Sequence, residues 1–265
     1  MALVGREARP LRNRLLAELP SEEDAQLRPH LERVSLGVKE VLYEPYQPIP
    51  YIYFPETGVL SILAIMGNGK TAEVGLVGHE GMLGLPVFLG GETSPRQAFA
   101  QVPGEALRMA APVFTAVLPR AGTLVRRLQR YTQALFTQVS QSAACNTLHE
   151  TTPRCCRWLL MTHDRVGSDE FLLTHEFLAR MLGVRRASVS ALAATLQQAG
   201  LIRYRWGQMT VVNRLGLEAA ACECYRIIAT EYDRLLGSPS AGVHRVPPLQ
   251  RGRHRGDPSL ELPEI

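Results

Sequence analysis

Long hydrophobic runs are missing from this sequence. No apolar stretch approaches the roughly 18 residues that a membrane-spanning helix needs. The N-terminus, MALVGREARPLRNRLL, lacks the continuous apolar segment of a signal peptide and carries Glu7 among its arginines. These absences argue against a membrane or secreted protein, so we expect a cytoplasmic location and no membrane partner.

Lysine is scarce too, because Lys39 and Lys70 are the only lysines and arginine supplies the remaining basic charge. Arginine suits phosphate and guanine recognition, but a GC-rich genome produces the same bias, so this composition assigns no function. The net charge of +4 means that any basic surface is local. With 46% hydrophobic residues in 265, the chain is a globular protein long enough for two domains.

Cysteine is limited to five residues, an odd number that suits a reducing compartment. Adjacent Cys155 and Cys156 point about 100° apart on a helix, and Cys222 and Cys224 point nearly to opposite sides. Neither pair has the spacing of a zinc or iron–sulfur site, so we predict buried free thiols. A redox role for Cys145 or Cys222 is the alternative.

Catalytic motifs are also lacking. We find no nucleophile–base pair, and the dipeptides His79-Glu80 and His149-Glu150 lack the second histidine of a helical zinc motif. We therefore predict that the protein is not an enzyme and binds no metal.

Residues 34–109 alternate apolar and polar side chains with period two, and Asn68-Gly69 forms a strong hairpin signal among them. Short strands at this density predict a β sandwich or jelly roll. We expect strands at 41–43, 51–54, 59–66, 71–77, 98–102 and 105–109, and short helices at 11–18, 22–31 and 112–118.

A glycine-rich segment, Gly78 to Pro86, interrupts this β region. Its glycines allow the backbone to approach a ligand, and Arg96 precedes the next strand on the same side. A solvated loop with a surface arginine explains the same residues equally well.

A proline-free stretch predicts one long helix over residues 121–148. Leu124, Leu128, Tyr131 and Leu135 follow the 4-3-4 spacing of an a/d seam. We favour a dimer contact on this seam over burial in the core, because a long helix between domains has no other obvious cover.

The segment from Thr174 to Gly200 predicts two short helices that cross at a turn. Thr174 is a good N-cap, Gly183 supplies positive φ, and a second helix runs from Arg186 to Gln198. This is the helix-turn-helix pattern of DNA-binding proteins. The alternative is a helical pair that binds protein only.

A basic hairpin follows, in which Arg203 and Arg205 alternate with apolar residues before Gly207. Together the elements predict a winged helix. We expect further helices at 154–165 and 214–236, and a disordered tail over 237–265, which is rich in proline, glycine and arginine.

The stretch LTHEFLARMLGVRRASVSALAATLQQAGLI resembles the helix-turn-helix of the Crp/Fnr family of bacterial transcription regulators. The resemblance covers about 20–236 and implies an α+β protein: an N-terminal β jelly roll like the cyclic-nucleotide-binding domain, a long dimerisation helix and a C-terminal winged helix-turn-helix. We place these parts at 1–120, 121–148 and 149–236, before the tail at 237–265.

The resemblance implies a homodimer on double-stranded DNA, with RNA polymerase as a further partner. Arg186 falls where the family typically reads guanine, and Ala187 replaces a common glutamate. The residues expected to contact bases are Arg186, Ala187, Ser188 and Ser190; those expected to hold phosphates are Thr174, Arg185, Arg203 and Arg205.

The family's phosphate cassette corresponds here to Gly84-Leu85 and Arg96-Gln97, and Ser140 falls where the long helix would meet a nucleotide. Leu85 replaces the glutamate that accepts a hydrogen bond from the ribose hydroxyl. This departure argues against cyclic AMP as the effector, so we assign no cofactor. The competing hypothesis is a cyclic-nucleotide-responsive module that binds protein and has no salt-dependent affinity for DNA.

Overall fold

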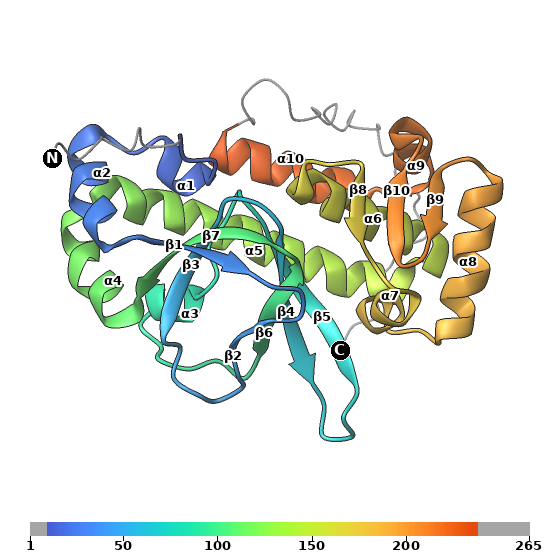
Figure 1. The fold of residues 1–265 in the computed structure, drawn as a ribbon, viewed down its shortest axis with the longest axis horizontal. Helices are drawn as coiled ribbons and strands as arrows, with labels where there is room; N and C mark the ends of the chain where they lie inside the picture. Colours follow the sequence, from blue (N-terminus) through green and yellow to red (C-terminus); the bar gives the residue numbers. More distant parts are fainter. Residues whose placement is uncertain (1–9, 238–265) are drawn as a thin grey trace, which may run out of the picture.

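The computed structural model describes residues 10–237, which form a β roll, a long helix and a second, mainly helical domain (Figure 1). Apart from Gly237, the predicted disordered tail lies outside the described residues. Among residues 10–237, every helix is too short or too polar to span a membrane.

Two antiparallel sheets, with strand orders β1-β7-β3 and β2-β6-β4-β5, form the β roll and confirm the predicted jelly roll. Each expected strand is present, and Gly69 (φ 77°) makes the predicted hairpin turn. The first strand, Glu32–Leu36, was not expected because its side chains are mostly exposed. The strands are β1 (Glu32–Leu36), β2 (Val41–Tyr43), β3 (Tyr51–Pro55), β4 (Val59–Ile65), β5 (Thr71–Val77), β6 (Gln97–Val102) and β7 (Gly104–Ala110).

Short helices close one end of the roll. Buried Asn13 fixes the first of them, because its side-chain amide donates to the carbonyls of Pro55 (3.0 Å) and Gly81 (2.8 Å) while its Oδ1 caps the helix. The first two helices are shorter than predicted, since the cap delays the start of one and Pro29 ends the other, whereas the predicted helix at 112–118 is present at 111–117. They are α1 (Arg14–Ala17), α2 (Ser21–Leu27), η1 (Arg28–His30), α3 (Leu85–Phe88), α4 (Ala111–Val117) and η2 (Leu118–Arg120).

The long helix α5 (Gly122–Leu148) has almost the predicted bounds, but its seam is covered by its own chain. Leu124, Leu128, Tyr131 and Leu135 are at most 7% exposed, packed against the roll and the N-terminal helices. The Tyr131 hydroxyl donates to the Met82 carbonyl at 3.1 Å. The prediction that these four residues form the dimer contact is therefore wrong.

The C-terminal domain contains the predicted helix pair and hairpin, with β8, β10 and β9 forming one sheet in that order. Its elements are α6 (Thr151–Val166), β8 (Glu170–Leu172), α7 (His175–Leu182), α8 (Arg186–Gln198), β9 (Ile202–Arg205), β10 (Gln208–Val211), α9 (Arg214–Ala220) and α10 (Cys224–Leu236).

The single helix expected over 214–236 is broken. Ala221 is extended (φ −79°, ψ 153°), so α9 ends and α10 starts in a new direction, running along α5 (Figure 1). The opposite orientations predicted for Cys222 and Cys224 assumed an unbroken helix. That prediction is wrong, because both side chains turn toward the C-terminal end of α5.

A buried ion pair joins the two halves of the molecule. Arg165 Nε on α6 lies 2.8 Å from Glu80 Oε1 in the loop after β5, and both side chains are at most 7% exposed. Arg165 also donates to Gln138 Oε1 of α5 (2.8 Å), which accepts a bond from the Tyr232 hydroxyl of α10 (3.3 Å). Burial alone would raise the pKa of Glu80, but Arg165 holds it below its usual value.

Replacing Arg165 with methionine should lower the free energy of unfolding by about 3–5 kcal/mol, because the Glu80 carboxylate would remain buried without its partner. Urea denaturation measures this loss. The double variant Glu80→Gln/Arg165→Met should recover much of it. Exposed ion pairs contribute on the order of 1 kcal/mol or less. A free energy of unfolding of Arg165→Met within about 1 kcal/mol of the wild-type value would therefore contradict a structural role for the buried pair.

Candidate DNA-binding surface and effector region

The helix pair α7–α8 has the geometry that its sequence predicts. Thr174 Oγ1 accepts a hydrogen bond from the Phe177 amide at 3.1 Å and caps α7. Gly183 (φ 67°) turns the chain, and the Val184 amide donates to the Ala179 carbonyl at 3.0 Å. The turn residues are thus used as predicted.

One face of α8 is exposed at the end of the molecule opposite α2 and α4 (Figure 1). The Ser190 hydroxyl already has partners within the protein, because it donates to the Arg186 carbonyl (3.2 Å) and lies 3.1 Å from His175 Nδ1. The exposed residues at the start of this face are Arg185, Arg186, Ala187, Ser188 and Ser190.

The wing presents Arg203 and Arg205 to solvent. Arg203 lies 3.6 Å from Glu170 Oε1. Because both side chains are exposed, breaking this ion pair so that Arg203 can bind another anion costs little free energy. Trp206 at the wing tip is 98% exposed, with φ 53°. The tip therefore places a bare aromatic ring beside the two arginines.

His175 is a half-buried residue beneath this surface that sequence reasoning missed. Its ring stacks on Tyr204 of the wing (centroids 4.2 Å apart) and its Nδ1 faces Ser190 of α8, so it links three elements of this surface. Burial and then the charge of Arg186 lower the pKa of His175. The only sequence signal was its place directly after the Thr174 cap.

The C-terminal domain rests on the β roll through α7. Phe177 meets Phe99 of β6 edge to face at 5.9 Å, and Met181 Sδ lies 3.9 Å from Ser61 Oγ of β4. These contacts use the inner side of α7 and leave the exposed face of α8 free.

The five predicted effector residues are not assembled around one cavity. Arg96 is exposed, Gln97 Nε2 donates to Glu44 Oε2 (2.8 Å), and Ser140 Oγ donates to the Phe136 carbonyl of its own helix (2.9 Å). Gly84 (φ 102°) caps α3, which Leu85 begins. In the part of the chain that the structure describes, these side chains form no common polar site.

The glycine-rich loop is filled by the chain itself. A β-carbon at Gly81 would collide with the Tyr131 ring, and one at Gly84 would lie 2.6 Å from Ile52 Cδ1. The Gly78 amide donates to Glu80 Oε1 at 3.2 Å. The glycines thus admit close packing of protein side chains, which differs from both predictions, a ligand cradle and a solvated loop.

Comparison with known proteins agrees with this geometry. Residues 33–120 match the model of the cyclic nucleotide-binding domain, and residues 153–220 match that of the Crp-like helix-turn-helix domain. The chain belongs to the Crp/Fnr family of transcriptional regulators. No curated protein matches it.

Three solved structures share the fold of this Crp/Fnr-family protein. FixK2 from Bradyrhizobium japonicum is 16% identical with a TM-score of 0.62, covering 72% of this chain and 98% of its own. A CRP-family regulator from Thermus thermophilus is 21% identical (TM-score 0.59, coverage 72% and 96%). The c-di-GMP responsive regulator CLP from Xanthomonas campestris is 16% identical (TM-score 0.56, coverage 72% and 99%).

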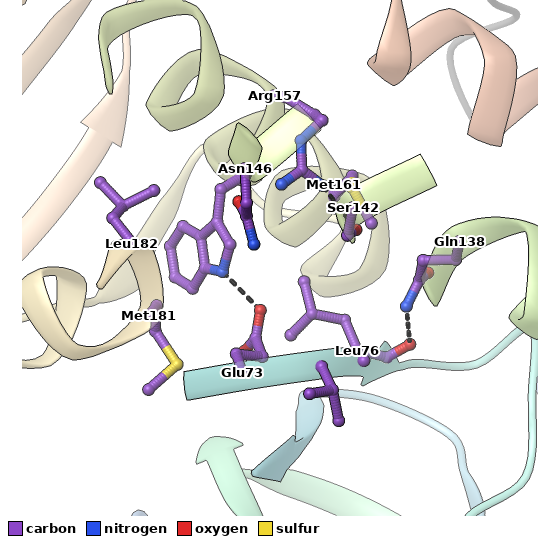
Figure 2. A pocket seen from close by; sticks show the side chains of 12 residues that line it. Glu73, Leu76, Gln138, Ser142, Asn146, Arg157, Met161, Met181 and Leu182 are labelled. Carbon is purple, nitrogen blue, oxygen red and sulfur yellow. Dashed lines mark hydrogen bonds between the residues drawn. The ribbon is translucent and has the colours of Figure 1, made fainter. Parts of the chain in front are cut away.

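A cavity of about 20 Å³ lies in this Crp/Fnr-family protein where β5, α5, α6 and α7 meet (Figure 2). It has room for roughly one water molecule and is far smaller than the roughly 300 Å³ of a ligand pocket. Glu73 borders it and accepts hydrogen bonds from Trp158 Nε1 (2.7 Å) and Ser61 Oγ (2.6 Å). Burial raises the pKa of Glu73 to about 7.

Glu73→Gln should remove a pH dependence of stability. Because the folded pKa of about 7 lies above the ordinary 4.5, the folded state gains stability from protonated Glu73 at low pH and loses it as pH rises from about 4.5 to 7. The melting temperature of Glu73→Gln relative to wild type should therefore increase across this interval and then level off. Glu92→Gln, at an exposed position, is the control; a constant difference between Glu73→Gln and wild type would contradict the assignment.

Proposed function

We propose that this chain is a cytoplasmic, homodimeric transcription regulator that binds an inverted-repeat DNA site through α8, with its β roll as a sensor or sensor-derived domain. The observation that carries this proposal is the exposed start of α8 with Arg185 and Arg186, which His175 links to the basic wing. A helix N-terminus with adjacent arginines favours the phosphates and guanines of a major groove.

The proposed contacts divide into base readers and phosphate holders. Arg186 would bond guanine, Ser188 and Ser190 would meet neighbouring base edges, and Ala187 offers only a methyl group for apolar contact. Arg185 lies just outside the helix and suits a phosphate. Thr174, Arg203 and Arg205 would complete the phosphate contacts.

The proposed dimer contact lies on the exposed face of α5, opposite the buried seam. Phe136 is 68% exposed and Val139 38% exposed, next to the small exposed residues Ser140 and Ala143. Phe136, Ser140 and Ala143 have the 4-3 spacing of a helix–helix seam. A two-fold axis there would place half-sites about one helical turn of DNA apart.

The sensor role of residues 1–120 stays a proposal without a named effector. Leu85 supplies no oxygen for a ribose hydroxyl, and Tyr131 and Glu80 occupy the glycine loop. We therefore expect no response to cyclic AMP. The further division into residues 121–148 and 149–236, and contact with RNA polymerase, also stay predictions.

Arg186→Ala should weaken binding to the preferred DNA by about 1–3 kcal/mol and relax discrimination at one base pair.

Arg203→Ala should weaken binding on all sequences and reduce the slope of log affinity against log salt concentration by about one. Fluorescence anisotropy on DNA from upstream of its own gene, across salt and with or without cyclic AMP, measures both effects. An equal loss on every sequence would contradict base reading by Arg186, and no salt-dependent affinity would favour the protein-binding module.

Phe136→Glu should dissociate the dimer, because a central apolar anchor contributes about 2 kcal/mol or more. We expect a dimer dissociation constant at least ~30-fold higher, measured by analytical ultracentrifugation. Leu89→Glu is the matched control, since Leu89 is 64% exposed but lies beyond α3 on the roll. If Phe136→Glu dimerises like the control, the exposed face of α5 is not the contact.

A further inference from the structure

Four side chains that sequence spacing does not connect meet where α5 ends. Cys145 and His149 lie one turn apart at the end of α5, while Cys222 lies in the break between α9 and α10 and Cys224 is the first residue of α10. Their sulfur and nitrogen atoms all lie within 4.8 Å of one another. Cys145 Sγ is 3.5 Å from Cys222 Sγ, and Cys224 Sγ is 3.5 Å from His149 Nδ1.

We infer that Cys145, His149, Cys222 and Cys224 bind one thiophilic divalent cation, with Zn²⁺ the ion that the ligand set fits best. Three cysteines and one histidine are a common structural zinc set. Zn–S bonds of about 2.3 Å give sulfur–sulfur edges of about 3.8 Å in a tetrahedron. The Cys145–Cys222 sulfur separation of 3.5 Å is close to this edge, and the other ligand atoms lie within 4.8 Å. An iron–sulfur cluster would need ligands on separate irons, spread over a wider space.

The neighbours of the cluster orient its ligands. His149 Nε2 lies 3.2 Å from Glu223 Oε1, which leaves Nδ1 facing the three sulfurs. A carboxylate on the second ring nitrogen is typical of metal-bound histidine. Gln141 Nε2 donates to Cys224 Sγ at 3.1 Å. Glu223 and Gln141 lie next to the ligands in the same segments of the chain, so the fold that brings the four ligands together also places these two hydrogen-bonding partners.

The charge balance also suits a divalent cation. Binding displaces the three thiol protons to solvent and leaves the histidine neutral, and no electron is transferred. Three thiolates and one divalent cation leave a single negative charge. Arg154 and Arg157 of α6 lie close enough to interact with the Cys145 sulfur electrostatically. The ionised site would therefore not be an isolated charge.

The position of the site indicates what a bound ion would do. Cys145 and His149 precede the α5–α6 junction, and Cys222 and Cys224 hold the start of α10, which runs back along α5 (Figure 1). A bound ion would fasten the DNA-binding domain to the long helix. All four positions of a tetrahedron are filled by protein, so the ion would be structural rather than catalytic.

The test starts with the full chain purified under reducing conditions without added metal. Elemental analysis should find about one zinc per chain, and cobalt loaded after chelation should give the visible absorption of a tetrahedral thiolate site. Cys222→Ser and Cys224→Ser should lose both signals. Cys155→Ala is the matched control, since Cys155 is buried in α6 outside the cluster and its variant should retain them.

Glu223→Gln covers the case in which a cysteine variant fails to fold. It keeps all four ligands and should weaken zinc affinity by about 10–100-fold, read by competition with a chromophoric chelator. Equal metal content in wild type and both serine variants, or wild-type affinity in Glu223→Gln, would overturn the assignment. Failure of the reduced wild-type chain to take up cobalt would also overturn the assignment. In that case, a Cys145–Cys222 disulfide in chain purified without reductant would assign the thiols to redox chemistry. Metal content is measured without DNA, so this result stands apart from that of the proposed function.

Discussion

The ion pair between Glu80 and Arg165 is the contact on which the relative position of the two domains depends. Both groups are removed from water, so each must find compensating partners, and these come from separate elements: the Gly78 amide, Gln138 of α5 and the Met161 carbonyl of α6. The contacts of one buried charge pair therefore bring the glycine loop, α5 and α6 to a single point. The helix pair that follows α6 is positioned by this requirement together with the contacts of α7 to Phe99 and Ser61.

Local signals predicted the DNA-binding domain well, because a cap at Thr174 and a positive φ at Gly183 act within a few residues. The β roll followed from period-two alternation for the same reason. The sequence could not show which part of the molecule covers the apolar seam of α5. Apolar residues at this spacing suit packing against a partner helix and packing against the β roll equally well. The thiol cluster was hidden because Cys145 and Cys222 are 77 positions apart and meet only through the helix break at Ala221.

These features give α5 three distinct surfaces with different tasks. Its buried seam packs on the roll, its exposed side carries Phe136, and its last turn carries Cys145 and His149. The glycine loop, filled by Tyr131 and Glu80, would have to repack to admit an effector, and such repacking would act directly on the ion pair.

Selection of binding sites from random double-stranded DNA by the full chain tests the central claim most directly. The account predicts enrichment of an inverted repeat whose half-sites lie about one helical turn apart, with a guanine in each half-site that Arg186→Ala no longer selects. Enrichment of nothing, or of a single half-site without symmetry, would contradict a dimeric regulator that reads DNA through α8.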